Sequence, residues 1–129
     1  MVRALPGINN STVKIKELLI GAFLFFLGQG LAWYQTNGQF ISPWIKNNPI
    51  LVSIIVGIPI GLLYIYGTRY VAEYSNGELW PVRIVGFVTG IVGFTFFTYI
   101  HLNESITLKT GVILTLATVI VLLQVFWKV

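Results

Sequence analysis

Four long stretches of apolar residues with almost no charged side chains dominate the sequence. They cover residues 18–34, 49–68, 82–102 and 106–127. A helix needs about 20 residues to cross the roughly 30 Å hydrocarbon core of a bilayer. Because the stretches are continuously apolar rather than alternating, helices are favoured over strands. The sequence therefore predicts an all-α, polytopic integral membrane protein with four transmembrane helices.

The composition excludes the other common classes of chain. Hydrophobic residues make up 56% of the 129 residues and charged residues only 9%, whereas a soluble domain has about 25% charged residues. A disordered chain would also be far more polar. We expect a single transmembrane domain over residues 1–129, with residues 1–12 as a cytoplasmic tail.

The basic residues predict the orientation of the helices. The connections between the stretches are short, so consecutive helices are expected to be antiparallel neighbours in a bundle. With four spans both termini share a side, and basic residues gather on the cytoplasmic side of membrane proteins. The side with the termini holds six of the eight basic residues, namely Arg3, Lys14, Lys16, Arg69, Arg83 and Lys128, and leaves Lys46 and Lys109 opposite. Both termini are therefore expected in the cytoplasm.

Small residues recur at helical spacing within three of the stretches. Such stripes let membrane helices approach closely, and packing within the bundle is favoured over a subunit interface. They comprise Gly57 and Gly61; Gly86, Gly90 and Gly93; and Gly111, Thr115 and Thr118. Pro59 lies between the first two glycines and removes a backbone donor, so a kink is expected there, as fixed curvature rather than as a hinge.

A few polar residues are candidates for a functional role. Gln29 has the most polar side chain deep in any stretch. Its amide needs a partner, for which a threonine of another helix is favoured. The alternative is that Gln29 lines a solute path together with Trp33 and Tyr64. His101 ends the third stretch, and we expect it to bond to Glu104 or to lipid headgroups.

Local signals also place one short helix and exclude several chemistries. Ser42 followed by Pro43 is typical of a helix start, which predicts a short interfacial helix through Trp44 and Ile45. The chain has no cysteine, and its lone histidine lacks companions for a metal site. The carboxylates form no catalytic constellation. We expect no enzyme activity, no metal or other cofactor, and no nucleic-acid partner.

The end of the chain resembles the small multidrug resistance family of the drug/metabolite transporters. The stretch HLNESITLKTGVILTLATVIVL (His101–Leu122) is similar to the short turn and last helix of those proteins, with Glu104 at the acidic or amide position and Gly111 at the helix glycine. The resemblance implies a four-helix architecture and a homodimer formed through the last helix. Those transporters have a membrane-embedded carboxylate in the first helix, whereas residues 18–40 of this chain contain none.

The resemblance and the composition leave three functional classes open. The first is a transporter of a small solute, similar to that family, or a non-transporting relative. The second is a structural or accessory membrane subunit, and the third is a holin-like pore former. An AT-rich residue usage and very short loops also resemble small membrane proteins of phages. The expected location is therefore a bacterial or phage-encoded inner membrane, with the lipid bilayer and a second copy of the chain as partners.

Overall fold

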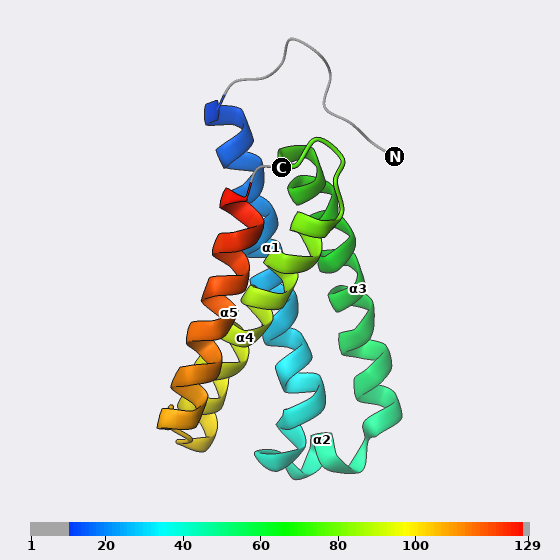
Figure 1. Ribbon diagram of the computed structural model, residues 1–129. Helices are drawn as coiled ribbons and strands as arrows, with labels where there is room; N and C mark the ends of the chain where they lie inside the picture. Colours follow the sequence, from blue (N-terminus) through cyan, green and yellow to red (C-terminus); the bar gives the residue numbers. More distant parts are fainter. Residues whose placement is uncertain (1–10, 128–129) are drawn as a thin grey trace.

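The computed structural model describes residues 11–127 and is helical, with no strand in that range (Figure 1). The long helices alternate in direction, so the start of the first and the end of the last lie at the same end of the molecule. The elements are α1 (Ser11–Asn37), the 3-10 turn η1 (Gly38–Phe40), α2 (Pro43–Asn47), α3 (Pro49–Tyr74), α4 (Trp80–Leu102) and α5 (Leu108–Phe126).

Three helices are long and apolar enough to cross a membrane. They are α1, α3 and α4, whose apolar segments run over Ile15–Phe40, Pro49–Tyr74 and Trp80–Leu102. The fourth apolar segment, Leu108–Gln124 in α5, is shorter. The all-α fold class is confirmed, and the helices indicate a membrane-embedded protein. The fourth span stays a prediction.

The helices extend beyond the predicted spans because charge limits a span but does not end a helix. α1 already includes Lys16, and α3 continues past Arg69 to Tyr74. Outside the hydrocarbon a charged side chain is solvated while the backbone bonds of the helix remain intact. Ser11 and Thr12, the last residues of the predicted cytoplasmic tail, belong to α1, and the location of the tail stays a prediction. Residues 1–10 lie outside the described residues.

The ends of the helices follow the sequence signals. The expected short helix is present as α2, with Ser42 at its N-cap position and Pro43 in its first turn. α4 ends at Asn103, whose φ of 56° is left-handed, a conformation that asparagine adopts more readily than most residues. α5 begins after Thr107, whose hydroxyl accepts a hydrogen bond of 3.2 Å from the backbone N–H of Thr110. Such a cap satisfies an N–H that the helix itself leaves unpaired.

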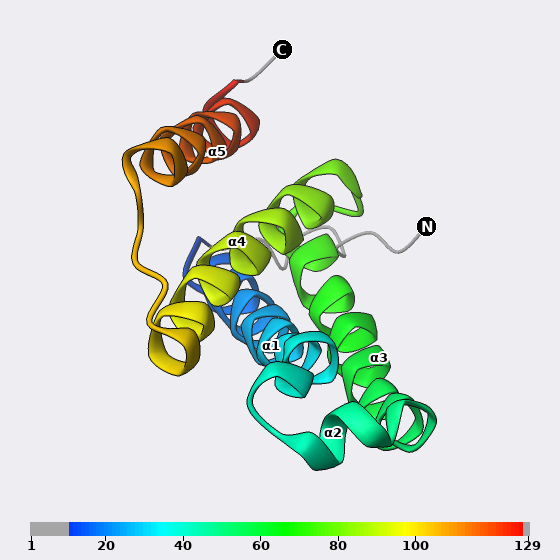
Figure 2. The same ribbon diagram turned by 90° about the horizontal axis from the view of Figure 1, so that it is seen from below.

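Helix α1 is the centre of the molecule. It packs against α3 on one side and α4 on the other, whereas α5 packs against α4 (Figure 2). The view along the helices shows α5 set apart from α1 and α3, joined to α4 by the extended segment 103–107. The antiparallel order matches the expected bundle, but α5 does not close it.

Backbone-to-backbone contact holds α1 and α3 together. A Cβ placed on Gly21 would lie 2.5 Å from Val71 Cγ2 and 3.0 Å from the carbonyl oxygen of Gly67. Gly28 likewise lies under the ring of Tyr64. Phe25 and Val71 are buried beside this contact, in a small apolar core. None of these three glycines, Gly21, Gly28 and Gly67, belongs to the small-residue stripes predicted from the sequence.

The two glycines of the predicted stripe in α3 differ in their contacts within the chain. A Cβ on Gly61 would meet nothing within 4 Å, and one on Gly57 would meet only the Gln35 amide, at 3.4 Å. Gly57 therefore faces Gln35 of α1, as expected for contacts within the bundle, whereas the expected packing is absent at Gly61. α1 approaches the face of α3 that carries the buried residues Val52, Ile60, Gly67 and Val71, and Gly61 makes no contact there. α3 continues as one helix through Pro59, and the kink stays a prediction.

We expect Gly21→Ala to lower the free energy of unfolding by about 1–3 kcal/mol, the usual cost of overpacking. The added methyl group would meet backbone atoms of α3 that have no room to move. Gly61→Ala is the matched control, because its methyl group meets no other atom and alanine favours the helix. Unfolding in mixed detergent micelles, followed by circular dichroism, measures both. Equal stability of the two variants would contradict the α1–α3 contact.

Candidate functional site

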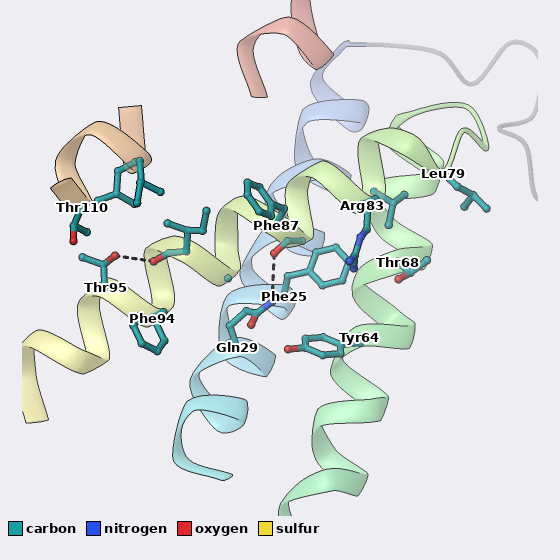
Figure 3. Close-up of a pocket in the computed structure, with 16 residues that line it drawn as sticks. Phe25, Gln29, Tyr64, Thr68, Leu79, Arg83, Phe87, Phe94, Thr95 and Thr110 are labelled. Carbon is teal, nitrogen blue, oxygen red and sulfur yellow. Dashed lines mark hydrogen bonds between the residues drawn. The ribbon is translucent and has the colours of Figure 1, made fainter. Parts of the chain in front are cut away.

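A groove with a volume of about 680 Å³ runs along α4 (Figure 3). Its walls come from α1 and α3 on one side and from α5 on the other. Most of the lining is apolar, and phenylalanines from α1 and α4 form much of it. Its polar lining residues are Gln29, Tyr64, Thr68, Arg83, Thr95 and Thr110.

Gln29 of α1 packs against the glycine stripe of α4, at the edge of the groove. Its Nε2 donates a 3.3 Å hydrogen bond to the carbonyl oxygen of Gly86. A Cβ on Gly90 would lie 3.1 Å from that same Nε2, and one on Gly93 would lie 3.4 Å from Gln29 Cβ. The glycines therefore make room for the glutamine to reach the backbone. The partner is a carbonyl, so the expected bond to a threonine of another helix is wrong.

Gly86 leaves the groove open. A Cβ on this residue would meet nothing within 4 Å, although Gly86 and Gly90 are both lining residues. The stripe therefore has two roles. Gly90 and Gly93 pack against Gln29, as expected for contacts within the bundle, whereas Gly86 provides empty space beside α4.

The three residues proposed for a solute path are only partly together. Gln29 and Tyr64 line the groove from α1 and α3. Trp33 is 3% exposed and its Nε1 donates a 2.9 Å hydrogen bond to Thr98 Oγ1 in α4. This bond links α1 to α4 away from the groove. A buried indole N–H needs an acceptor, but only the fold shows that Thr98, itself 5% exposed, provides it.

His101 takes part in an aromatic cluster between α1 and α4. Its Nε2 is hydrogen-bonded to the hydroxyl of Tyr34. The imidazole ring stacks on the ring of Trp33, with 5.3 Å between the ring centroids. It also stacks on the ring of Phe97, with 6.5 Å between the centroids. The expected bond to Glu104 is therefore wrong, because the helices bring the Tyr34 hydroxyl to the imidazole. Glu104 is exposed in the 103–107 segment.

The small-residue stripe of α5 is exposed at Thr115 and Thr118 and half-buried at Gly111. Thr115 and Thr118 donate their hydroxyls within the helix, to Gly111 O at 2.9 Å and to Leu114 O at 3.0 Å. The buried side chain of α5 is Ala117 instead. Hydroxyls bonded in this way need no partner from another helix, so this face is compatible with contact to lipid or to a second copy.

The charges of the groove are sparse. Of the lining residues that the structure describes, Arg83 is the only charged one, and it is exposed. Within residues 11–127 no three histidine, cysteine or acidic side chains lie close enough to hold a metal ion. The groove is thus suited to binding by apolar contact, a few hydrogen bonds and one positive charge.

Comparison with known proteins gives no family assignment. No protein-family model matches the chain, and no similar curated protein or solved structure is found. The function is therefore inferred from the groove and from the residues that line it.

We expect Thr98→Val to lower the free energy of unfolding by about 1–2 kcal/mol, because it leaves the buried Trp33 N–H without an acceptor. The matched control is Thr118→Val, which removes an exposed hydroxyl that bonds only within its own helix. Detergent unfolding titrations compare the two. A control variant destabilised as much as Thr98→Val would show that the Trp33–Thr98 bond does not link the helices.

Proposed function

We propose that the chain is a small, transporter-like membrane protein that takes a small solute into the groove along α4. The observation that supports this function is the groove itself, whose volume of about 680 Å³ falls within the range of about 300–1,000 Å³ for ligand pockets. Its lining is mostly apolar with a few polar side chains, as in such pockets. A non-transporting relative would bind the solute in the same place.

Gln29 gives the groove a polar group at depth. Its only hydrogen bond among the described residues is the one that Nε2 donates to Gly86. The carbonyl oxygen of the amide therefore remains available to a donor on a solute. Tyr64 faces the same space from α3 (Figure 3), and its hydroxyl is able to donate or accept. Trp33 is left out of this path.

The arrangement of α5 provides a way into the groove. α5 rests on α4 and connects to it through the extended segment 103–107. A helix held by one neighbour moves relative to α1 and α3 at less cost than a helix packed on two sides. The groove between α5 and α1 is thus accessible from within the bilayer.

We further propose four spans, with both termini in the cytoplasm. α5 has 19 residues, which corresponds to about 28 Å at the usual rise per residue, close to the roughly 30 Å of the hydrocarbon core. Lys109, near its start, is able to reach the headgroups. The excess of basic residues on the side of the termini supports the orientation.

Reporter fusions test this topology. A fusion after Val129 is expected to report the cytoplasm, and one placed at Lys46 in α2 is expected to report the opposite side. A fusion after Asn76, between α3 and α4, serves as the cytoplasmic control. A reporter that is active outside when fused after Val129 would contradict either the four spans or their orientation.

A photoreactive, uncharged 12-carbon alcohol tests the groove as a solute site. We expect it to label the purified protein mainly at residues of the groove, mapped by mass spectrometry. Gly86→Leu places a side chain in the empty space beside α4 and should reduce the labelling several-fold. Gly61→Leu adds the same side chain outside the groove, at a position where an added Cβ meets no other atom, and should leave the labelling unchanged. Labelling spread evenly over all helices would contradict the proposed function.

The other classes have less support from the structure. The face with the half-buried Gly111 and the exposed Thr115 and Thr118 suits the homodimer that the resemblance implies, and the homodimer stays a prediction. The accessory subunit and the holin-like pore former also stay predictions, as does the bacterial or phage-encoded inner membrane.

A further inference from the structure

The charge of the groove constrains what it binds. Among the described residues, Arg83 is the only charged residue that lines it, and no carboxylate of that part of the chain does. A lipophilic cation, the substrate class of the family that the sequence resembles, would meet no opposite charge there. An anion would meet a guanidinium, which offers several N–H donors to a carboxylate or a phosphate.

Arg83 has no partner of its own among the described side chains, which cover residues 15–124, 126 and 127. It forms no ion pair and no side-chain hydrogen bond with them. The carboxylates nearest in the sequence, Glu73 and Glu78, are exposed and do not line the groove. Arg69, by contrast, lies outside the groove, with its guanidinium 5.0 Å from the ring centroid of Tyr66. Figure 3 shows the Arg83 side chain directed into the groove, toward Phe25.

The apolar part of the groove extends away from Arg83. The lining of α4 continues from Arg83 in the first turn to Thr95, a length of about 18 Å at the usual helical rise. One leaflet of the hydrocarbon core is about 15 Å thick. The groove therefore accommodates one extended hydrocarbon chain, flanked by Phe25, Phe87 and Phe94.

We propose that the solute is a single-chain anionic amphiphile, of which a long-chain fatty acid is the simplest. Its headgroup binds Arg83 near the cytoplasmic membrane surface, and its chain lies along α4 toward Gln29 and Thr95. The proposal rests on the proposed function and names the substrate class of the same groove. One chain is favoured over two because the volume matches that of a small-molecule pocket.

Three photoreactive probes of equal chain length test the charge preference. They are a 16-carbon fatty acid, the corresponding alcohol, and the corresponding trimethylammonium compound, each with a diazirine in the chain. Purified full-length protein in an uncharged detergent is expected to bind the fatty acid at least tenfold more tightly than the trimethylammonium probe. A diazirine-labelled phosphatidylglycerol, tested in parallel, should label the protein more weakly than the fatty acid does.

Variants of two arginines test the headgroup site. Arg83→Gln should weaken fatty-acid labelling about tenfold, the effect of losing a hydrogen bond to a charged group. It should leave labelling by the alcohol unchanged. Arg83→Lys keeps the charge and should retain most of the binding. Arg69→Gln is the matched control, since it removes a positive charge near the C-terminal end of α3, close in sequence to Arg83 but outside the groove.

The outcomes separate the substrate class from the proposed function. If all three probes label the groove equally, or if Arg69→Gln lowers fatty-acid labelling as much as Arg83→Gln does, the substrate class is wrong while the groove remains a solute site. Stronger labelling by phosphatidylglycerol would overturn the single-chain ligand. If Gly86→Leu changes the labelling by none of the probes, the groove is not the site and the proposed function fails as well.

Discussion

The close approach of α1 and α3 is the contact on which the rest of the molecule depends. Lipid gives membrane helices little hydrophobic reason to associate, so packing between small residues has to hold them together. Gly21 and Gly67 let the two backbones meet, and Gly28 accommodates the ring of Tyr64. This contact fixes one side of α1. Another face of α1 packs against α4, which also contacts α3, and the position of α4 in turn determines where the groove runs.

Most serine and threonine hydroxyls within the described helices form hydrogen bonds with the backbone of their own helix. Threonine hydroxyls donate to carbonyls one turn earlier, as Thr89, Thr95 and Thr115 do. Two longer side chains instead reach across to α4, where Gln29 bonds to the Gly86 carbonyl and Trp33 to Thr98. In a medium without water these two bonds orient α1 against α4. The glycine stripe that admits Gln29 also leaves the space beside Gly86 empty, so packing and the groove share one structural origin.

Arg83 and α5 give this space its chemical character. α5 supplies the outer wall but is held by α4 and the 103–107 segment, so the groove is bounded without being enclosed. Arg83 places a positive charge at one end of a mostly apolar groove. Together they favour an amphiphile whose headgroup is negative. The resemblance to the small multidrug resistance family suggests the opposite charge, because a membrane-embedded carboxylate is central to those transporters and is missing from residues 18–40 here.

The sequence by itself determined the helical class, the positions of the long helices and the short helix after Ser42, because these depend on local apolar runs and on proline and cap residues. It also identified Gln29 as a polar residue in need of a partner. Only the tertiary structure decided which glycines make contact, that His101 bonds to Tyr34, and that Trp33 lies away from the groove. A run of apolar residues around a helix does not mark which face meets a neighbour. Gly61 and Gly67 are alike in the sequence, and only the approach of α1 to one face of α3 separates them.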